Sequence, residues 1–516
     1  MPVLSNDALP LIYYKPFLFD NDFEALFPEL FLVSVGVFLL LYGVLWSTRR
    51  DRNYPDLLGN ITWLTLFSLA LTMALIVNNP FHTTSLFFNT LIVDDWTQFM
   101  KLLVLGSSFI CIAMATTYVR QESVNAFEYM LLILFSTVSM LFLISSADFI
   151  SMYLAVELQS LCFYVLAAIK RNSEFSTEAG LKYFLLGAFS SGLLIFGTSL
   201  VYGFTGITNF SDLSTMFAAG TGEILSTTSA LPGCELGMVF ILMGFFFKLA
   251  AAPFHMWSPD VYEGAPTSVT AYFVIAPKAA VFAVLLRIFL GSFYDLFGTW
   301  QTIVIVVSIV SMVVGALGAL AQTRLKRFLA YSSIGHAGYL LAGMACGTLA
   351  GVQALVIYLV VYLLMNITIF ALVLTPLART GDQRPGHLKY ITDLSNLGTT
   401  NPILAATLAI TLFSIAGIPP LAGFYSKAYL FFATMGANLY VLAVVGVLTS
   451  VVSCFYYIRV IKIMYFEKPD TWTSAARVPV ENATILGLSL FAIIFLMAYP
   501  APLHTVTHKV ALSLCM

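Results

Sequence analysis

Residues 245–280 read FFFKLAAAPFHMWSPDVYEGAPTSVTAYFVIAPKAA, and this stretch decides the fold. Two apolar runs flank an interruption at Pro253, and each run carries a lysine, Lys248 or Lys278. Pro253 has no N–H to offer the carbonyl of Leu249, so it predicts a break in the first apolar helix. Unpaired backbone at membrane depth survives only inside protein or beside water. The stretch therefore predicts a polar site inside a membrane protein.

The composition of the whole chain indicates a polytopic membrane protein. Of 516 residues, 59% are hydrophobic and only 10% are charged, whereas soluble domains carry about 25% charged residues. The 24 basic and 26 acidic residues leave a net charge of −2, which argues against nucleic-acid binding. A soluble enzyme and a disordered chain are excluded as well. We expect most of the chain to lie in lipid, at about 20 apolar residues per span.

The sequence predicts no cofactor or metal site in this chain. Its six cysteines lie far apart without a C-x-x-C pair, which argues against a disulfide framework, a zinc site or iron–sulfur ligands. Neither a G-x-G-x-x-G nor a G-x-x-x-x-G-K-[ST] motif indicates nucleotide binding. The acidic amino-terminal segment is typical of neither a signal peptide nor a transit peptide, so we expect synthesis where the chain is inserted.

Apolar runs separated by polar, glycine or proline residues predict fourteen membrane-spanning helices. The predicted spans are residues 25–46, 57–77, 96–118, 126–146, 148–169, 177–204, 236–256, 265–290, 300–321, 328–346, 350–376, 401–435, 438–466 and 483–503. Basic residues support this count, because they concentrate in loops on one side of a membrane. They occur in every odd-numbered loop except the seventh, and in no even-numbered loop. We therefore expect fourteen helices with both termini on the outer side.

A few ionisable residues fall inside the predicted spans. They are Glu157, Lys248, Lys278 and Lys427 near the middle of spans, Lys182 early in the sixth span and His336 inside the tenth. A charge at the centre of a span costs about 2.5–3.5 kcal/mol, so such residues favour a functional site. A lysine can instead neutralise a buried acid, but Glu157 is the only central acid available to the three central lysines. His336 can equally be a hydrogen-bonded core residue.

The twelfth span contains a second interruption, SIAGIPPLAGFYSK, which ends at Lys427. Pro419 and Pro420 free the carbonyls of Ile415 and Ala416, four residues earlier. Because the two interrupted spans are five apart, spans 4–8 and 9–13 are predicted to form two five-helix repeats, the second inverted. Inverted repeats with broken helices at matching positions are typical of transporters.

At these residues the sequence resembles a known family. The segments are YLAVELQSLCFYVLAA around Glu157, STEAGLKYFLLGAFSSG around Lys182, RFLAYSSIGHAGY around His336 and GIPPLAGFYSKAYLF at Lys427, together with residues 245–280. They resemble the antiporter-like membrane subunits of NADH:ubiquinone oxidoreductase, respiratory complex I. The lysine at position 427, the short stretch after the last span and the three first helices favour the subunit 2 type, in its full-length plant or algal mitochondrial form.

The resemblance implies a proton pathway through the middle of the membrane. In this family an acid on the fifth helix pairs with a lysine on the seventh, and these match Glu157 and Lys248. A lysine on the eighth helix, matching Lys278, continues a hydrated line, and Lys427 matches the last member towards the outer side. Opening or closing the first pair would change the protonation of Lys248 and of Lys278.

The resemblance also implies which groups support this pathway. Lys182 and His336 match supporting or relay groups, and histidine suits a relay because it titrates near neutral pH. FMN, the iron–sulfur clusters and the quinone site are expected in partner subunits, so this chain performs no redox chemistry itself. Expected partners are subunit 4, the small subunits on the quinone side and membrane phospholipids.

We therefore expect a proton-translocating subunit of complex I, driven by NADH:quinone electron transfer in its partners. Residues 1–125 would hold three helices, 126–291 the first repeat, 292–466 the inverted repeat, and 467–516 the last loop and helix. The expected location is the mitochondrial inner membrane rather than a bacterial plasma membrane, with both termini in the intermembrane space. Two alternatives remain open: a free-standing cation/proton antiporter and a non-pumping structural or coupling subunit.

Overall fold

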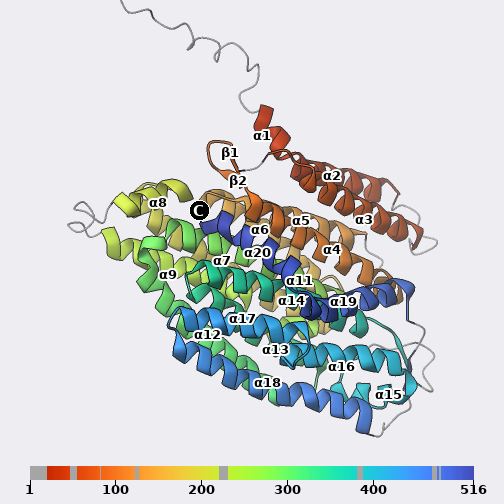
Figure 1. The fold of residues 1–516 in the computed structure, drawn as a ribbon. Helices are drawn as coiled ribbons and strands as arrows, with labels where there is room; N and C mark the ends of the chain where they lie inside the picture. Colours follow the sequence, from red (N-terminus) through yellow and green to blue (C-terminus); the bar gives the residue numbers. More distant parts are fainter. Residues whose placement is uncertain are drawn as a thin grey trace, which may run out of the picture.

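The computed structural model describes residues 20–46, 55–81, 83–122, 127–219, 230–379, 388–467, 473–475 and 478–515, and these form a bundle of helices (Figure 1). Within these ranges, twelve helices are long and apolar enough to cross a membrane. The predicted all-α polytopic class is therefore confirmed.

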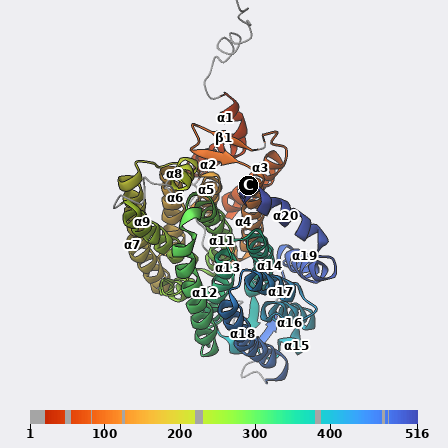
Figure 2. The same ribbon diagram turned by 60° about the vertical axis from the view of Figure 1, so that its left-hand side comes forward.

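The amino-terminal helices pack along one side of the bundle. The elements are α1 Asp20–Ala25, α2 Phe27–Trp46, α3 Pro55–Val77 and α4 Asp95–Gln121, with β1 Thr84–Leu86 and β2 Leu91–Val93 between the last two helices. β1 and β2 pair antiparallel, with Leu86 opposite Leu91. The carboxyl terminus lies near this hairpin in Figures 1 and 2.

The middle of the chain forms the next group of helices. These are α5 Glu128–Ser145, α6 Phe149–Ala167, α7 Glu174–Thr205, α8 Phe210–Ala219, α9 Ala230–Leu249, α10 Trp257–Gly264 and α11 Thr267–Arg287, followed by a π-helical turn at Ile288–Ser292 and a 3-10 turn at Tyr294–Leu296. α11 is central in Figure 2, and all of its side chains are buried. A helix that is apolar all round belongs in the centre of a bundle.

The last third of the chain contributes the remaining elements. These are α12 Phe297–Leu320, α13 Leu325–Ala345, α14 Leu349–Val373, β3 Leu377–Arg379, a 3-10 turn at Ile391–Leu394, α15 Leu397–Thr400, α16 Pro402–Ala416, α17 Ala422–Gly436, α18 Tyr440–Phe466, β4 Thr473–Ala475, α19 Val480–Ala498 and α20 Ala501–Cys515. β3 pairs antiparallel with β4, so the segment after α14 lies against the segment before α19.

The last predicted span, 483–503, is wrong in its extent. α19 ends at Ala498 and a separate helix, α20, begins at Ala501. Pro500 explains the separation, because a proline disfavours helical backbone at the residue before it. α20 packs against α4 and α14.

Both spans with predicted proline breaks are interrupted. Residues 250–256 separate α9 from α10, and residues 417–421 separate α16 from α17. Gly417 caps α16 with a φ of 89°, a left-handed conformation that suits glycine after a helix. The first predicted span of this pair, 236–256, overlaps the candidate span Pro232–Leu249, and the short helix α10 follows the break and ends at Gly264.

Glycines allow two helix pairs to approach closely. A Cβ atom on Gly197 of α7 would lie 2.7 Å from the carbonyl oxygen of Gly237 on α9. A Cβ atom on Gly338 of α13 would lie 2.8 Å from the backbone nitrogen of Met312 on α12. Small residues at contacts are a common means of packing helices in membranes.

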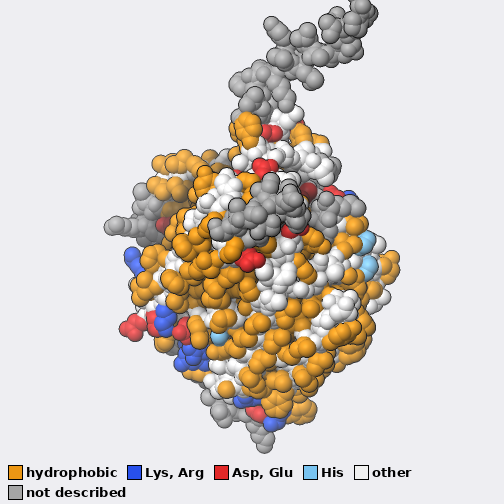
Figure 3. Space-filling view, turned by 90° about the vertical axis from the view of Figure 1, so that its left-hand side faces the viewer, with side chains coloured by type: hydrophobic (Ala, Val, Ile, Leu, Met, Phe, Trp, Pro, Cys, Tyr) orange, Lys and Arg blue, Asp and Glu red, His pale blue; other side chains and the backbone are white. Residues whose placement is uncertain are grey.

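The surface is mostly apolar. In the view of Figure 3 hydrophobic side chains cover most of the face, and acidic and basic side chains form small groups. Such a surface is compatible with lipid and with partner subunits in a membrane.

Candidate functional site

Lys278 is held in the centre of the bundle by oxygen acceptors from two other helices. Its residue is 3% exposed, and Nζ donates to the carbonyl of Ser333 on α13 and to the hydroxyl of Tyr362 on α14, both at 2.9 Å. Nζ also lies 4.8 Å from the ring centre of Tyr362, where the ring face attracts a cation. Lys278 therefore links α11 to α13 and α14.

His336 lies next to the same tyrosine. Its ring centre is 5.3 Å from that of Tyr362. Nδ1 lies 2.6 Å from the hydroxyl of Tyr358, and Nε2 lies 3.5 Å from the hydroxyl of Tyr457 on α18. Both ring nitrogens can exchange a proton with a hydroxyl, and the tautomer decides which partner donates.

Lys427 is bound at the second helix break. Its residue is 6% exposed, and Nζ donates to the carbonyls of Ile415 at 2.9 Å and Ala416 at 3.0 Å. These are the two carbonyls that the sequence predicted to be freed by the proline pair. Nζ also lies 5.3 Å from the ring centre of Tyr339. The broken backbone is therefore the acceptor for the lysine.

A run of aromatic rings connects these three groups. The ring of Tyr339 lies 6.2 Å from that of His336 and 6.0 Å from that of Tyr358. The connected side chains, called the buried row below, are Lys278, Tyr362, His336, Tyr358, Tyr339 and Lys427. They come from four helices, α11, α13, α14 and α17.

Lys248 lies at the end of α9, beside the first break. Its Nζ is buried and makes no hydrogen bond to any residue that the structure describes. A cavity of about 20 Å³ is lined by Lys248, Lys278, Ser160 and other side chains. About 10–15 Å³ of such volume is enough for one water molecule. The cavity therefore places Lys248 within reach of the buried row through one water.

Glu157 lies on α6 and is half-buried. Its carboxylate accepts hydrogen bonds from Tyr153 at 3.2 Å and Ser160 at 2.7 Å. The expected direct ion pair is not formed, since no ion pair within 4.0 Å joins Glu157 to Lys248, although both residues are described. Ser160 connects them instead, because it bonds Glu157 and also lines the small cavity.

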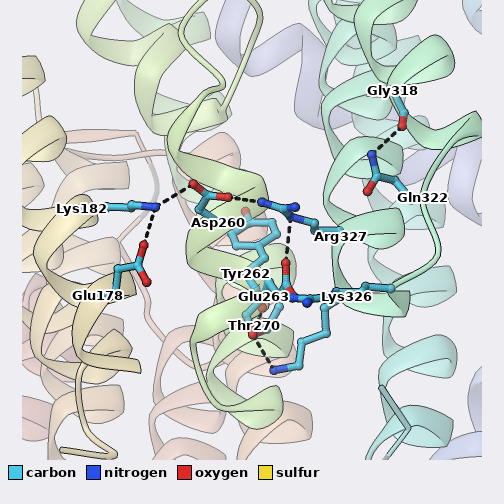
Figure 4. Close-up of polar contacts among 11 residues, drawn as sticks. Glu178, Lys182, Asp260, Tyr262, Glu263, Thr270, Gly318, Gln322, Lys326 and Arg327 are labelled. Carbon is cyan, nitrogen blue, oxygen red and sulfur yellow. Dashed lines mark hydrogen bonds and ion pairs between the residues drawn. The ribbon is translucent and has the colours of Figure 1, made fainter. Parts of the chain in front are cut away.

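Lys182 lies apart from the buried row. Its side chain is 41% exposed, and Nζ pairs with Glu178 at 2.7 Å and with Asp260 on α10 at 3.0 Å. Asp260 also pairs with Arg327 on α13. Figure 4 shows this order, with Lys182 and Glu178 on one side of Asp260 and Arg327 on the other.

Further charges complete this group, which we call the ion-pair cluster. Its members are Glu178, Lys182, Asp260, Glu263, Arg324 and Arg327. They line a pocket of about 350 Å³. Lys326 Nζ donates nearby to the carbonyls of Glu263 at 3.1 Å and Ala265 at 2.7 Å. The cluster therefore fastens α10, the helix after the first break, to both α7 and α13.

Sequence reasoning missed the tyrosines of the buried row. Tyr358 and Tyr362 are four residues apart on α14, a spacing that puts both on one helix face. A pattern of buried charges does not reveal uncharged hydroxyls. Sequence reasoning also missed His255 in the first break, which is buried and whose Nδ1 bonds no described residue.

Two buried ion pairs near helix ends were missed as well. Lys101 Nζ on α4 lies 2.5 Å from the carboxylate of Glu29 on α2. Arg287 on α11 lies 2.7 Å from Asp94, which also caps α4. These residues lie close to predicted span edges, where a charge is difficult to tell from a loop charge. They attach the amino-terminal helices to one another and to the centre of the bundle.

The described ranges contain no group of three or more His, Cys, Asp or Glu side chains arranged to hold a metal ion. Five cysteines in those ranges are free thiols, namely Cys111, Cys162, Cys234, Cys346 and Cys454. The side chains gathered in and beside the buried row are lysine, histidine, tyrosine, serine and carboxylate groups, which can exchange protons through hydrogen bonds.

The fold of this chain is similar to that of chains in two solved protein complexes. A chain of respiratory complex I from Thermus thermophilus is 30% identical and superposes with a TM-score of 0.76, over 93% of this chain and 98% of that one. A chain of the Mrp complex from Dietzia sp. DQ12-45-1b has a TM-score of 0.78 over 96% and 97% of the two chains. At 21% identity the second likeness shows the shared fold.

Comparison of sequences gives the family. The profile of the family described as "NADH:quinone oxidoreductase/Mrp antiporter, TM" matches residues 146–453. The NADH-ubiquinone oxidoreductase chain 2 of Marchantia polymorpha is 53% identical over 500 residues, 97% of this chain and all of that protein. The chain therefore belongs to the NADH:quinone oxidoreductase/Mrp antiporter family and, within it, to the chain 2 type of NADH-ubiquinone oxidoreductase.

Proposed function

We propose that this chain moves protons across the mitochondrial inner membrane as an antiporter-like subunit of NADH:ubiquinone oxidoreductase. The observation that carries the proposal is the buried row, in which two lysines and a histidine are joined by tyrosines through the centre of the bundle. Buried ionisable groups at membrane depth are costly and mark proton relays. The family membership supports the same role.

The proposed path runs from Glu157 to Lys427. A proton would pass from Glu157 through Ser160 and water in the small cavity to Lys248 and then to Lys278. Tyr362 and His336 would carry it on towards Lys427. Each lysine can donate while protonated and accept while neutral, and the hydroxyls between them can do both. The energy would come from electron transfer in partner subunits, which would hold FMN, the iron–sulfur clusters and the quinone.

We also propose fourteen membrane crossings. α13 and the pair α16–α17 would add two crossings to the twelve candidate spans. The two interrupted helices, α9–α10 and α16–α17, would occupy matching positions in inverted repeats at residues 126–291 and 292–466. Residues 1–125 and 467–516 would form the flanking segments.

The setting of the chain follows from the same proposal. An even number of crossings puts both termini on one side, proposed as the intermembrane space. The partners would be subunit 4 and the small subunits on the quinone side, together with phospholipids. Lys182 would support the path indirectly by holding α10, and His336 would act as a relay.

A substitution of Lys278 tests the proposal. In the assembled complex, Lys278→Met should lower the number of protons moved per NADH oxidised, while NADH:ferricyanide activity and assembly remain unchanged. Proton uptake by inverted membrane vesicles measures this ratio. Lys462→Met on the exposed end of α18 is the matched control and should pump normally. Full pumping by an assembled Lys278→Met complex would contradict the proposed path.

Two further experiments separate the alternatives. A non-pumping coupling subunit predicts that neutralising Lys248, Lys278 and Lys427 together leaves the proton ratio unchanged. A free-standing antiporter predicts that the chain is purified without NADH-oxidising partners and exchanges sodium for protons in vesicles. The likeness to the Mrp complex chain supports a shared fold only, whereas membership of the chain 2 type of NADH-ubiquinone oxidoreductase supports the complex I role.

A further inference from the structure

A groove between four helices lies outside both the buried row and the ion-pair cluster. It encloses about 450 Å³ and is lined by residues of α3, α4, α14 and α19. All four helices are candidate membrane spans. Trp63 and Leu488 on its walls are 68% and 71% exposed. The groove therefore opens at the surface of the bundle, where the surroundings in a membrane are lipid.

Polarity changes along this groove. One end carries Arg120, at the end of α4, and Glu481, in the first turn of α19. Thr116 and Thr484 follow one turn further in, and both line the groove. The deeper walls are mostly apolar and include Leu66, Phe109, Ile110, Leu364, Ile367 and Leu488, and Ser489 also lines the groove. A polar end that leads into an apolar channel matches a phospholipid, whose headgroup continues into ester groups and acyl chains.

The length of the groove fits an acyl chain. Phe109 precedes Arg120 by eleven residues on the same helix, which corresponds to a rise of about 16 Å. That distance covers about half of the hydrocarbon core of a bilayer, which is about 30 Å thick. One leaflet's lipid can therefore lie with its headgroup at Arg120 and its tail at Phe109.

The charged end of the groove carries one positive and one negative group that do not neutralise each other. Arg120 and Glu481 are both exposed, and no ion pair within 4.0 Å joins them to each other or to another described residue. The guanidinium of Arg120 lies over α3, since a Cβ on Gly59 would be 3.3 Å from its Nη2. A ligand with both a phosphate and an ammonium group matches this pair.

We propose that the groove binds one molecule of phosphatidylethanolamine. Its phosphate would accept hydrogen bonds from Arg120, its ammonium would donate to Glu481, and one acyl chain would fill the apolar part. Phosphatidylcholine carries the same charges, but its quaternary ammonium has no N–H to donate. Phosphatidylglycerol and cardiolipin have no cation for Glu481. This proposal does not depend on proton translocation.

Photo-crosslinking in the assembled complex tests the proposal. The complex is placed in nanodiscs that contain a diazirine-labelled phosphatidylethanolamine or the matched phosphatidylcholine, and crosslinked peptides are quantified by mass spectrometry. We expect peptides from residues 109–120 and 481–489 to be labelled roughly tenfold more by phosphatidylethanolamine, the factor typical of a lost hydrogen bond to a charged group. Equal labelling by the two lipids in the wild-type complex would overturn the proposal.

Three variants separate the parts of the site. Glu481→Gln should remove the preference between the two lipids, and Arg120→Gln should lower labelling by both. Ala113→Phe on α4 places a ring inside the groove and should abolish labelling. Ala483→Phe lies on α19, another helix of the groove, but outside the groove lining, and should not change labelling. Unchanged preference in Glu481→Gln, or a partner polypeptide seen in the groove by electron microscopy of the complex, would also overturn the proposal.

Discussion

The two helix breaks place a lysine beside interrupted backbone, yet the two ammonium groups have different surroundings. At the second break, Lys427 donates to two carbonyls that the interruption has freed. At the first break, the buried Nζ of Lys248 bonds to no residue that the structure describes. Lys248 lines the small cavity of about 20 Å³, which is large enough for one water molecule.

We therefore expect Lys248 and Lys427 to have different roles. A lysine held by two backbone carbonyls is fixed in position, because breaking those bonds leaves oxygen atoms unpaired. A lysine without fixed partners is free to respond to a change in a nearby charge, such as that of Glu157. Lys248 at the first break would then respond to the charge of Glu157, whereas Lys427 at the second break would stay fixed in position.

Substituting each lysine by methionine gives the largest expected difference between the breaks. Lys427→Met leaves the carbonyls of Ile415 and Ala416 without a donor, at about 1–3 kcal/mol for each buried group. Lys248→Met orphans no partner and removes a buried ammonium without a bond, so it should leave stability unchanged or raise it. Thermal unfolding of the assembled membrane arm measures both. Equal destabilisation by the two variants would refute the distinction between anchored and unanchored lysines.

Tyr362→Phe is expected to have the next largest effect, because it removes one acceptor of Lys278. A hydrogen bond to a charged group contributes about 1.5–3 kcal/mol. The remaining acceptor, the Ser333 carbonyl, would then hold the ammonium alone. We expect a several-fold lower rate of proton pumping at normal NADH oxidation by the peripheral redox centres. Tyr440→Phe, at an exposed tyrosine of α18, serves as control, and a normal rate in Tyr362→Phe would remove this tyrosine from the path.

Gly417→Ala tests the geometry of the second break alone. The glycine has a φ of 89°, and side-chain-bearing residues there cost about 1–2 kcal/mol. The new Cβ would also lie 3.0 Å from Cδ of Lys427, so the lysine must shift. We expect reduced pumping together with a modestly lower unfolding temperature. Gly436→Ala, where a Cβ would meet nothing within 4 Å, should change neither quantity, and identical behaviour of the two variants would count against the proposed role of Gly417.

Arg327→Gln should have the smallest effect, and it concerns the first break. This arginine pairs with Asp260 and with Glu263, at 2.8 Å for the latter, and its side chain is 39% exposed. Partly exposed ion pairs contribute about 0–1 kcal/mol. We expect slightly easier proteolysis of the segment after Lys248 at low salt, and no difference from wild type at high salt, where charges are screened. A large effect that persists at high salt would contradict this view of the ion-pair cluster.

Local features of the chain were sufficient to predict both breaks and the three central lysines. Proline lacks an N–H wherever it stands, so the interruptions near Pro253 and near Pro419 and Pro420 follow from the sequence. The same rule named the two carbonyls that Lys427 now binds. The helical class followed from composition and hydropathy, because a helix satisfies its own backbone in lipid.

Contacts between distant segments were harder to predict. The direct pair of Glu157 with Lys248 was expected from family resemblance. In the structure, Ser160 bonds Glu157 and lines the small cavity that Lys248 also lines. Lys182 was expected near the path, yet it lies in the ion-pair cluster with Asp260. A side chain on a helix can face any neighbouring helix, and the rotation and position of its own helix in the bundle decide which neighbour it contacts.

The sequence by itself determined the helical class, the two breaks near proline and the three central lysines. Those properties depend on covalent structure and on the partition of each segment into lipid, and both are local. Only the tertiary structure decided which oxygen atoms surround each lysine. Tyr362 and Ser333 reach Lys278 from two other helices, 84 and 55 residues away, and such contacts exist only once the helices have packed.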